Sequence, residues 1–182
     1  MEHILLWGRR RSGRSALIRR LLREVSAPVF GYETLTLRTR PDGYHQIYLF
    51  PYGAENPEPR EENHAADCNG SDRVVYPQVF NGLGVELLRR QVPGILVMDE
   101  TGFLESGAED FCRAVLDRLE GDTPVLAAVR AGMDTDFLRR VRGHEKARCL
   151  EMVPKRFAEY EALLRPLVRE WNDSLMRKDR QG

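Results

Sequence analysis

Residues 8–15 read Gly8-Arg9-Arg10-Arg11-Ser12-Gly13-Arg14-Ser15. The stretch fits the phosphate-binding pattern G-x-x-x-x-G-K-[ST], except that Arg14 stands where the pattern has lysine. An apolar run over residues 3–7 precedes the loop and predicts a short buried strand. Apolar residues at helical spacing follow it and predict a helix over residues 15–25. Strand, glycine loop and helix in this order are the context that the pattern requires.

This loop has a physical reason to bind phosphate. Gly8 and Gly13 allow backbone conformations closed to other residues and a close approach to oxygen atoms. We expect the amides of residues 12–15 to converge at the start of the helix, where partial positive charge attracts phosphate. The Ser15 hydroxyl is then placed to bind Mg²⁺. Positive charge is plentiful around the loop, because Arg9, Arg10 and Arg11 lie within it.

A second nucleotide signal lies at Asp99 and Glu100. Four apolar residues precede the two acids, so residues 94–100 predict a buried strand whose tip reaches the site. In enzymes with a phosphate loop, an acid at the end of such a strand holds the Mg²⁺ shell, which predicts that role for Asp99. A glutamate directly after it can orient or deprotonate the attacking water, which predicts that role for Glu100.

Length and composition fit one soluble domain over residues 1–182, with 42% hydrophobic residues. The 28 basic and 28 acidic residues cancel, which argues against general binding of nucleic acid or of a membrane surface. Three of the basic residues are lysines, so the preference for arginine is general and Arg14 follows it. Three scattered cysteines without a signal peptide predict a reducing, cytoplasmic location. A monomer is the favoured oligomeric state.

Strand and helix signals alternate along the chain. They predict an α/β fold with a mainly parallel sheet and helices on both faces. The turn Pro41-Asp42-Gly43 joins two extended segments, which adds an antiparallel β-hairpin. The predicted strands are 3–7, 30–38, 44–50, 94–100, 124–129 and 148–153, and the predicted helices are 15–25, 79–90, 109–119, 135–141 and 155–176.

Two features of this pattern are less regular. Residues 51–72 contain three prolines and little apolar content, so they predict a long mobile loop. Pro166 lies inside the last helix, where it is expected to kink or split it. We also expect the strand that ends in Asp99 to lie beside the strand that ends at Trp7.

The sequence resembles the cancer-related nucleoside-triphosphatase family of small P-loop proteins over most of its length. Besides the loop, Asp99-Glu100-Thr101-Gly102-Phe103-Leu104-Glu105 looks like that family's D-E-I-G-K-M-E. Three weaker matches lie in the same order: Gly31-Tyr32-Glu33 through Gly43-Tyr44 of the hairpin, Arg73-Val74-Val75-Tyr76, and Lys155-Arg156.

The resemblance implies a RecA-like P-loop NTPase fold and Mg²⁺-dependent hydrolysis of ATP, GTP or other nucleoside triphosphates with loose base preference. It carries phosphate binding to the loop and to Ala16 after it, and nucleotide binding to Arg156. It carries the metal role to Ser15 and Asp99, and the base role to Glu100.

Two departures from the family pattern bear on the rate. Arg14 replaces the phosphate-bridging lysine, and Phe103 replaces the lysine after the two acids. A guanidinium is longer and more planar than an ammonium, so Arg14 predicts slow hydrolysis. An Arg14 that reaches the β- and γ-phosphates would take part in catalysis. An Arg14 directed at Asp99 or Glu100 would leave the loop without its central cation.

Two other functions remain open at this point. The first is a non-catalytic module that binds nucleotide or a protein partner, which the two departures favour. The second is a small-molecule kinase in which residues 51–72 act as a lid. The kinase hypothesis is weakened because Arg60 is the one basic residue before Arg73 in that segment. The intact pair of Asp99 and Glu100 favours the triphosphatase.

Overall fold

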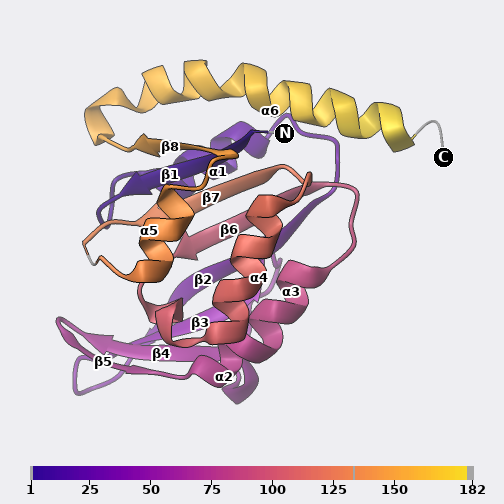
Figure 1. Ribbon diagram of the computed structural model, residues 1–182. Coiled ribbons are helices and arrows are strands. Elements are labelled where there is room, and N and C mark those ends of the chain that lie inside the picture. Colours follow the sequence, from indigo (N-terminus) through magenta and orange to yellow (C-terminus); the bar gives the residue numbers. More distant parts are fainter. Residues whose placement is uncertain (1, 133, 180–182) are drawn as a thin grey trace.

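The computed structural model describes residues 2–132 and 134–179 of the chain. Its centre is one eight-stranded sheet in the order β5-β4-β3-β2-β6-β7-β1-β8, flanked by helices on both faces (Figure 1). The pairs β2–β6, β6–β7, β7–β1 and β1–β8 are parallel. The pairs β2–β3, β3–β4 and β4–β5 are antiparallel. The predicted α/β fold with a mainly parallel part and an antiparallel hairpin is therefore confirmed.

The elements follow the alternating sequence signals closely. The strands are β1 His3–Gly8, β2 Val29–Thr39, β3 His45–Pro51, β4 His64–Asn69, β5 Asp72–Val75, β6 Ile95–Thr101, β7 Val125–Arg130 and β8 Ala147–Glu151. The main helices are α1 Arg14–Leu22, α2 Pro77–Val79, α3 Val85–Arg89, α4 Glu109–Glu120, α5 Asp136–Arg142 and α6 Phe157–Asp179. A π-helical stretch, Phe80–Gly84, joins α2 to α3, so the helix expected over residues 79–90 is present with an irregular middle.

The sheet packs its two faces against different helices. Alternation along β1 sends Ile4 and Leu6 into a cluster with α1 and α6. Leu5 points the other way, into a cluster with α3, α4 and α5. All three side chains are fully buried. This two-sided burial fixes β1 in the sheet, and the loop that follows β1 is held at the carboxyl edge of the parallel strands.

Residues 51–72 differ from the expected mobile loop in their second half. His64–Asn69 forms β4, which pairs antiparallel with β3, and a short 3₁₀ turn precedes it. Ala65 and Ala66 are fully buried in this strand, because small side chains fit between the sheet and the helices behind it. The expectation of an unstructured loop, and of a lid over that whole range, is therefore wrong for β4.

Pro166 does not split the last helix. The helix α6 is continuous from Phe157–Asp179 and crosses one end of the molecule beside α1 (Figure 1). Leu164, Val168 and Trp171 bury its inner face, so tertiary packing holds the helix together across the proline. None of the described helices is both long and apolar enough to cross a membrane.

The order of the strands corrects one further expectation. β6, which carries Asp99, pairs with β2 and β7, and β7 lies between it and β1. The two strands are therefore not neighbours. Because all three are parallel, their carboxyl ends still meet at one edge of the sheet. The loop after β1 and the acids of β6 consequently face each other across the end of β7.

Candidate active site

The loop between β1 and α1 has the geometry that its glycines predict. Gly13 has a φ of +92° and sits directly before the first residue of α1. A Cβ on Gly8 would lie 2.6 Å from Ser12 Oγ, so the loop can fold back on β1 because Gly8 has no side chain. The loop thus turns tightly and presents the open amino end of α1.

One of the four amides expected to face a phosphate is used within the loop. The Ser12 amide donates to the Arg9 carbonyl at 3.2 Å and closes a turn in which Arg11 has a φ of 63°. The expectation for residues 12–15 is therefore wrong for Ser12. Arg14 and Ser15 begin α1, where amides have no carbonyl of the preceding turn to bind. Their amides are the ones that the helix start offers to an anion.

Ser15 and Asp99 are brought together as the sequence predicts. The Ser15 hydroxyl donates to Asp99 Oδ1 at 2.7 Å, from the first turn of α1 to the end of β6. Asp99 is 4% exposed, and this burial raises the pKa of its carboxyl while the bond from Ser15 opposes the rise. Two oxygen atoms of the kind that hard cations prefer are therefore adjacent at the carboxyl edge of the sheet.

The Arg14 side chain is directed at one of the two acids, which is the second alternative that the sequence left open. Its Nη2 donates to Glu100 Oε2 at 2.6 Å, and the same nitrogen lies 3.3 Å from the Arg9 carbonyl. Arg130, at the end of β7, approaches the other oxygen of Glu100 with Nη1 at 3.4 Å. The carboxylate of Glu100 is thus held between two guanidinium groups.

Asp99 and Glu100 both face the loop although they are consecutive in one strand. Side chains normally alternate between the two faces of a sheet. The pairing of β6 with β7 shifts between Asp99 and Thr101, so Glu100 has no partner in that register. Such irregularities re-aim side chains near active sites. Here Asp99 reaches Ser15 and Glu100 reaches Arg14 on neighbouring positions of α1.

The Arg14 guanidinium is buried but incompletely bonded. The side chain is 4% exposed, and burial lowers its pKa while the charges of Glu100 and Asp99 oppose the fall. Its Nε and Nη1, together with Ser12 Oγ, are buried without a hydrogen-bond partner among the described residues. Buried donors of this kind are normally satisfied. These three atoms point to a ligand that supplies oxygen acceptors inside the loop.

The predicted nucleotide-binding residues gather around a small cavity. It has a volume of about 180 Å³ and is lined by Arg11, Ser12, Gly13, Arg14, Ser15, Ala16 and Glu100. Arg9, Arg10 and Arg11 are exposed, and Arg11 is the one of the three that lines this cavity. The structure therefore brings residues 11–16 of the predicted site together with Glu100, while the predicted Gly8, Arg9, Arg10 and Arg156 do not line this cavity.

Arg156 precedes Phe157, which contacts the loop, but its own side chain is paired with Glu159. Its Nε donates to Glu159 Oε2 at 2.8 Å, on the exposed side of the turn before α6. The next residue, Phe157, packs against Gly13, where a Cβ would lie 3.4 Å from the ring. The start of α6 thus borders the loop, while the Arg156 guanidinium is paired with Glu159.

Sequence reasoning missed three residues near the site. Arg130 contacts Glu100, and its position at the end of a buried parallel strand was the signal that could have found it. Glu105 is 2% exposed and accepts from the Gly102 amide at 2.8 Å, and burial raises its pKa to about 7. Arg73 lies over the Phe103 ring at 4.3 Å, a contact between segments that sequence spacing does not reveal.

Comparison with known families agrees with this geometry. A family model described as "NTPase" matches residues 3–160. The chain belongs to the NTPase family. The resemblance expected from the loop and the acidic segment is confirmed, and the protein is a member of a family of nucleoside-triphosphate hydrolases.

Two solved structures share the fold. THEP1 from the hyperthermophile Aquifex aeolicus has a TM-score of 0.70 at 17% identity, covering 92% of this chain and 99% of that chain. A human cancer-related nucleoside triphosphatase has a TM-score of 0.67 at 19% identity, covering 93% of this chain and 98% of that chain. The sequence has no significant match among curated proteins.

Proposed function

We propose that the protein is a Mg²⁺-dependent nucleoside-triphosphate phosphohydrolase of broad base preference whose turnover is slowed by Arg14. The observation that carries this proposal is the loop itself. Arg14 and Ser12 hold buried, unsatisfied polar atoms there, within a cavity that Glu100 also lines. Phosphate oxygens are the acceptors that such donors and a helix start favour.

Arg14 must exchange partners for the reaction to proceed. In the structure its Nη2 is bound to Glu100, and its Nε and Nη1 are the donors left for phosphate oxygens. Binding of the β- and γ-phosphates beside Arg14 would compete with Glu100 for the same guanidinium. Release of Glu100 would then leave a carboxylate free to act on water. This competition is the physical reason that we expect slow turnover.

Glu100 is the proposed general base. The oxygen of a water molecule attacks the γ-phosphorus, the bond from that phosphorus to the β–γ bridging oxygen breaks, and the water proton passes to Glu100. Arg130 lies 3.4 Å from the same carboxylate and holds it in place while Arg14 turns to the phosphates. Positioning and charge stabilisation supply most of the catalysis in such reactions.

The residues present fit a magnesium ion. Ser15 Oγ and Asp99 Oδ1 are oxygen donors 2.7 Å apart at the edge of the loop. Mg²⁺ takes few protein ligands and completes its shell with water and substrate phosphates. Within residues 2–132 and 134–179 no cluster of three His, Cys, Asp or Glu side chains forms a metal cage, and this mode of binding needs none. When bound, Mg²⁺ would neutralise charge on the phosphate oxygens.

The remaining site residues are proposed to act on the phosphates. Arg9, Arg10 and Arg11 are exposed around the loop and would attract the charged substrate. Arg156 could approach a bound nucleotide only by leaving Glu159, an exposed pair that contributes little. We further propose that the enzyme works in a reducing cytoplasm, because Cys68, Cys112 and Cys149 are all free thiols.

A second function has one specific observation in its favour. The pair between Arg14 and Glu100 occupies both the central cation and the proposed base of the site. A protein in which phosphate failed to break this pair would bind nucleotide through backbone amides and surface arginines without turnover. Such a protein would be a nucleotide- or partner-binding module.

Phosphate release from a panel of nucleoside triphosphates distinguishes the two functions. The wild type should release phosphate in the presence of Mg²⁺ and lose this activity when the metal is chelated. Glu100→Gln should fall to background. Glu86→Gln is the matched control, because Glu86 pairs with Arg90 on the exposed face of α3 at 3.6 Å. Release by the wild type that is no faster than release by Glu100→Gln would reject the hydrolase in favour of the binding module.

A further inference from the structure

A larger cavity adjoins the proposed site on the side of the antiparallel strands. It has a volume of about 290 Å³, near the lower end of the range of small-molecule pockets. One end is formed by Ser15, Asp99 and Glu100, where the reacting phosphate is expected. The other end is formed by residues of β2 to β5, among them Thr36, Cys68 and Arg73. These strands make no part of the phosphate loop.

Charge is divided unevenly within this cavity. The acids Asp99, Glu100 and Glu105 all come from β6 or the turn that follows it. Arg10 comes from the loop and Arg73 from β5, and both are exposed. In the described part of the chain neither of these two arginines forms an ion pair. The cavity therefore carries the charges of Arg10 and Arg73, which no ion pair among the described residues neutralises.

The Phe103 ring contacts two guanidinium groups that line the cavity. The Arg73 guanidinium lies 4.3 Å from the centre of the Phe103 ring, and that of Arg130 lies 5.4 Å from it. Attraction between a cation and the face of an aromatic ring holds such groups in place. Position 103, where the family pattern has a lysine, thus keeps positive charge nearby through two arginines from other strands.

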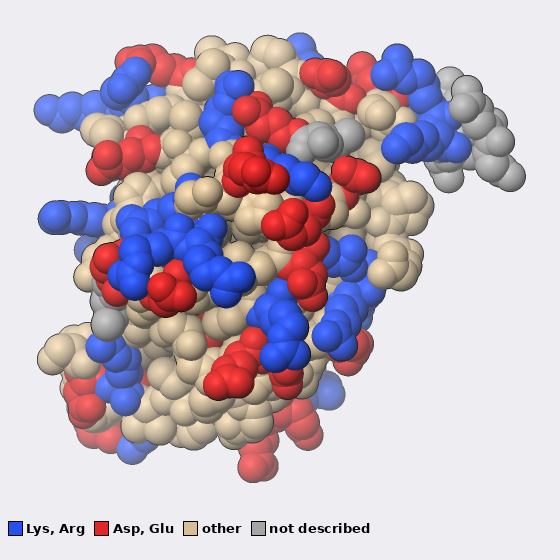
Figure 2. Space-filling model, in the orientation of Figure 1, with Lys and Arg blue, Asp and Glu red and all other residues tan. Residues whose placement is uncertain are grey.

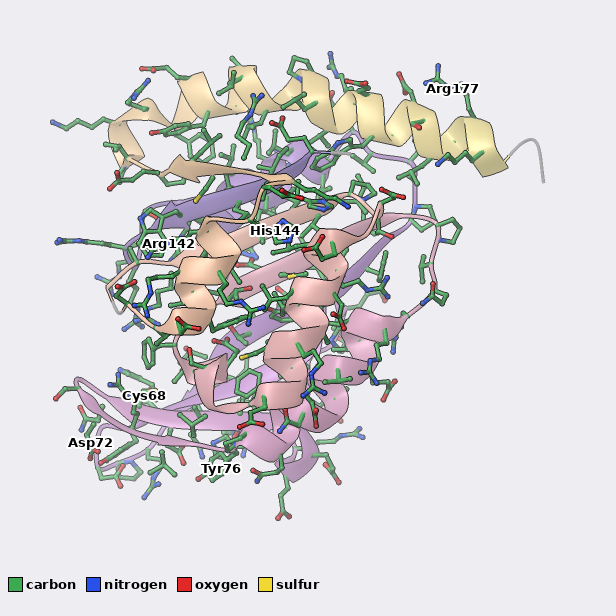
Figure 3. The ribbon with its side chains drawn as sticks, in the orientation of Figure 1. Cys68, Asp72, Tyr76, Arg142, His144 and Arg177 are labelled. Atoms are coloured by element: carbon green, nitrogen blue, oxygen red, sulfur yellow. The ribbon has the colours of Figure 1, made fainter. Side chains whose placement is uncertain are left out.

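Cys68 lines the same cavity as the arginines. This residue lies on β4 beside the β4–β5 turn (Figure 3) and is half-buried on the cavity wall. Burial raises the pKa of its thiol, and the charges of Arg130, Arg73 and Arg10 oppose the rise. Cys68, Arg130, Arg73 and Arg10 therefore all line the same cavity, although they come from β4, β7, β5 and the loop.

We propose that this cavity is a second oxyanion site, which binds a phosphate group while nucleotide occupies the loop. Arg73 and Arg10 supply the charge, with Arg130 between them and the acids. The proposal rests on the proposed function for the place of the nucleotide. Two sources share the required chemistry: the inorganic phosphate released by hydrolysis, and a small phosphomonoester that binds beside the triphosphate.

Titration of inorganic phosphate into the protein saturated with Mg²⁺ and a nucleoside diphosphate tests the proposal by calorimetry. Phosphate should bind, and Arg73→Ala should weaken that binding about tenfold, as expected for one charge-assisted contact. Arg38→Ala is the matched control, because Arg38 is an exposed arginine of the same sheet that does not line the cavity. Its effect should stay within about twofold.

Alkylation of the three cysteines provides a second measurement on the same samples. Phosphate should slow the modification of Cys68 and leave the rates at Cys112 and Cys149 unchanged, since neither of these lines the cavity. Absence of phosphate binding, equal weakening in Arg73→Ala and Arg38→Ala, or a Cys68 rate that ignores phosphate would each overturn the proposal.

The design separates this proposal from the proposed function. Failure of the nucleoside diphosphate to bind would contradict the nucleotide site, and the effect of Arg73→Ala on phosphate binding would still decide the cavity. Glycerol 3-phosphate, used in place of inorganic phosphate, distinguishes the two sources. Binding at least about tenfold tighter than inorganic phosphate indicates a phosphomonoester site, and equal or weaker binding indicates a site for released phosphate.

Discussion

Replacing Glu100 with glutamine should separate binding from hydrolysis, because Glu100 holds the guanidinium that we propose to bind the phosphates. The substitution removes the charge that faces Arg14 Nη2 at 2.6 Å but keeps a hydrogen-bond acceptor. Breaking a buried ion pair costs about 3–5 kcal/mol. Glu100 is 26% exposed and the amide still accepts a bond, so we expect a loss of about 2 kcal/mol in the free energy of unfolding. For a domain of this size the melting temperature should fall by about 4–8 °C.

The same change should tighten nucleotide binding. In the wild type, phosphate must displace a carboxylate from Arg14, and the carboxylate also repels the incoming charge. Without that charge we expect the Kd for a Mg²⁺-bound triphosphate to fall about tenfold, equivalent to about 1.4 kcal/mol. Hydrolysis should meanwhile drop by at least about 100-fold, since the proposed base is lost.

Three measurements on one preparation check this reasoning: thermal unfolding, nucleotide titration and phosphate release. Glu86→Gln controls for the loss of a surface carboxylate and should change none of them appreciably. Weaker nucleotide binding by Glu100→Gln would refute the competition between Glu100 and phosphate. Undiminished hydrolysis would refute the role of Glu100 as base.

Three further substitutions test other parts of the account. Ser15→Ala removes the 2.7 Å bond to Asp99 and one proposed metal ligand. Nucleotide titration with and without Mg²⁺ should therefore show at least about a tenfold loss of the affinity that depends on the metal. An unchanged effect of the metal would refute the assignment of Ser15 as a ligand. Burial raises the pKa of Glu105 to about 7, so its stabilising contribution is complete below about pH 4.5 and is lost as pH rises through about 7, by about 3 kcal/mol in total. Urea unfolding across this range should show that slope in the wild type and a flatter one in Glu105→Gln, and identical slopes would contradict the assignment. A Cβ on Gly84 would lie 2.7 Å from the Phe111 ring, so Gly84→Ala should lower the free energy of unfolding by about 1–3 kcal/mol. Gly82→Ala is the control, because a Cβ there would meet nothing within 4 Å and should not lower it. Equal effects of the two substitutions would contradict the packing argument.

The sequence predicted the strands that are marked by a continuous run of apolar residues. The apolar run of β1 is buried from His3 to Leu6, and the glycine loop and α1 follow it as expected. The strand β6 likewise combines a buried apolar run with two terminal acids. In both cases burial on two faces leaves a continuous apolar run that cannot be mistaken for a surface segment.

The missed strands lack such a signal. β4 is buried through Ala65 and Ala66, whose small side chains carry little apolar content, and prolines precede it. β5 is a short strand at the edge of the sheet, and Val74 within it is 50% exposed. β4 is defined by its pairing with β3 and β5, and β5 by its pairing with β4, and composition does not record such pairing between segments.

The site was predicted more fully than the arrangement of strands that builds it. Carboxyl ends of parallel strands meet at one edge whatever their order, so Ser15 and Asp99 are joined although β7 lies between β1 and β6. The sequence could not show which group the Arg14 side chain faces. A bound phosphate and the carboxylates of Asp99 and Glu100 are both negatively charged, so either could pair with the guanidinium. In the structure the Arg14 guanidinium is buried, and its Nη2 donates to the carboxylate of Glu100.

Steady-state hydrolysis by the wild type and by Arg14→Lys, measured beside Glu100→Gln, tests the central claim most directly. A lysine side chain is shorter than that of arginine and ends in a compact ammonium, so it should hold Glu100 less closely than Arg14 Nη2 does and fit beneath the phosphates better. We therefore predict measurable wild-type turnover, a higher kcat in Arg14→Lys, and background rates in Glu100→Gln. A wild-type rate equal to that of Glu100→Gln, with no gain in Arg14→Lys, would contradict the claim that this site hydrolyses nucleoside triphosphates at a rate limited by the pair of Arg14 and Glu100.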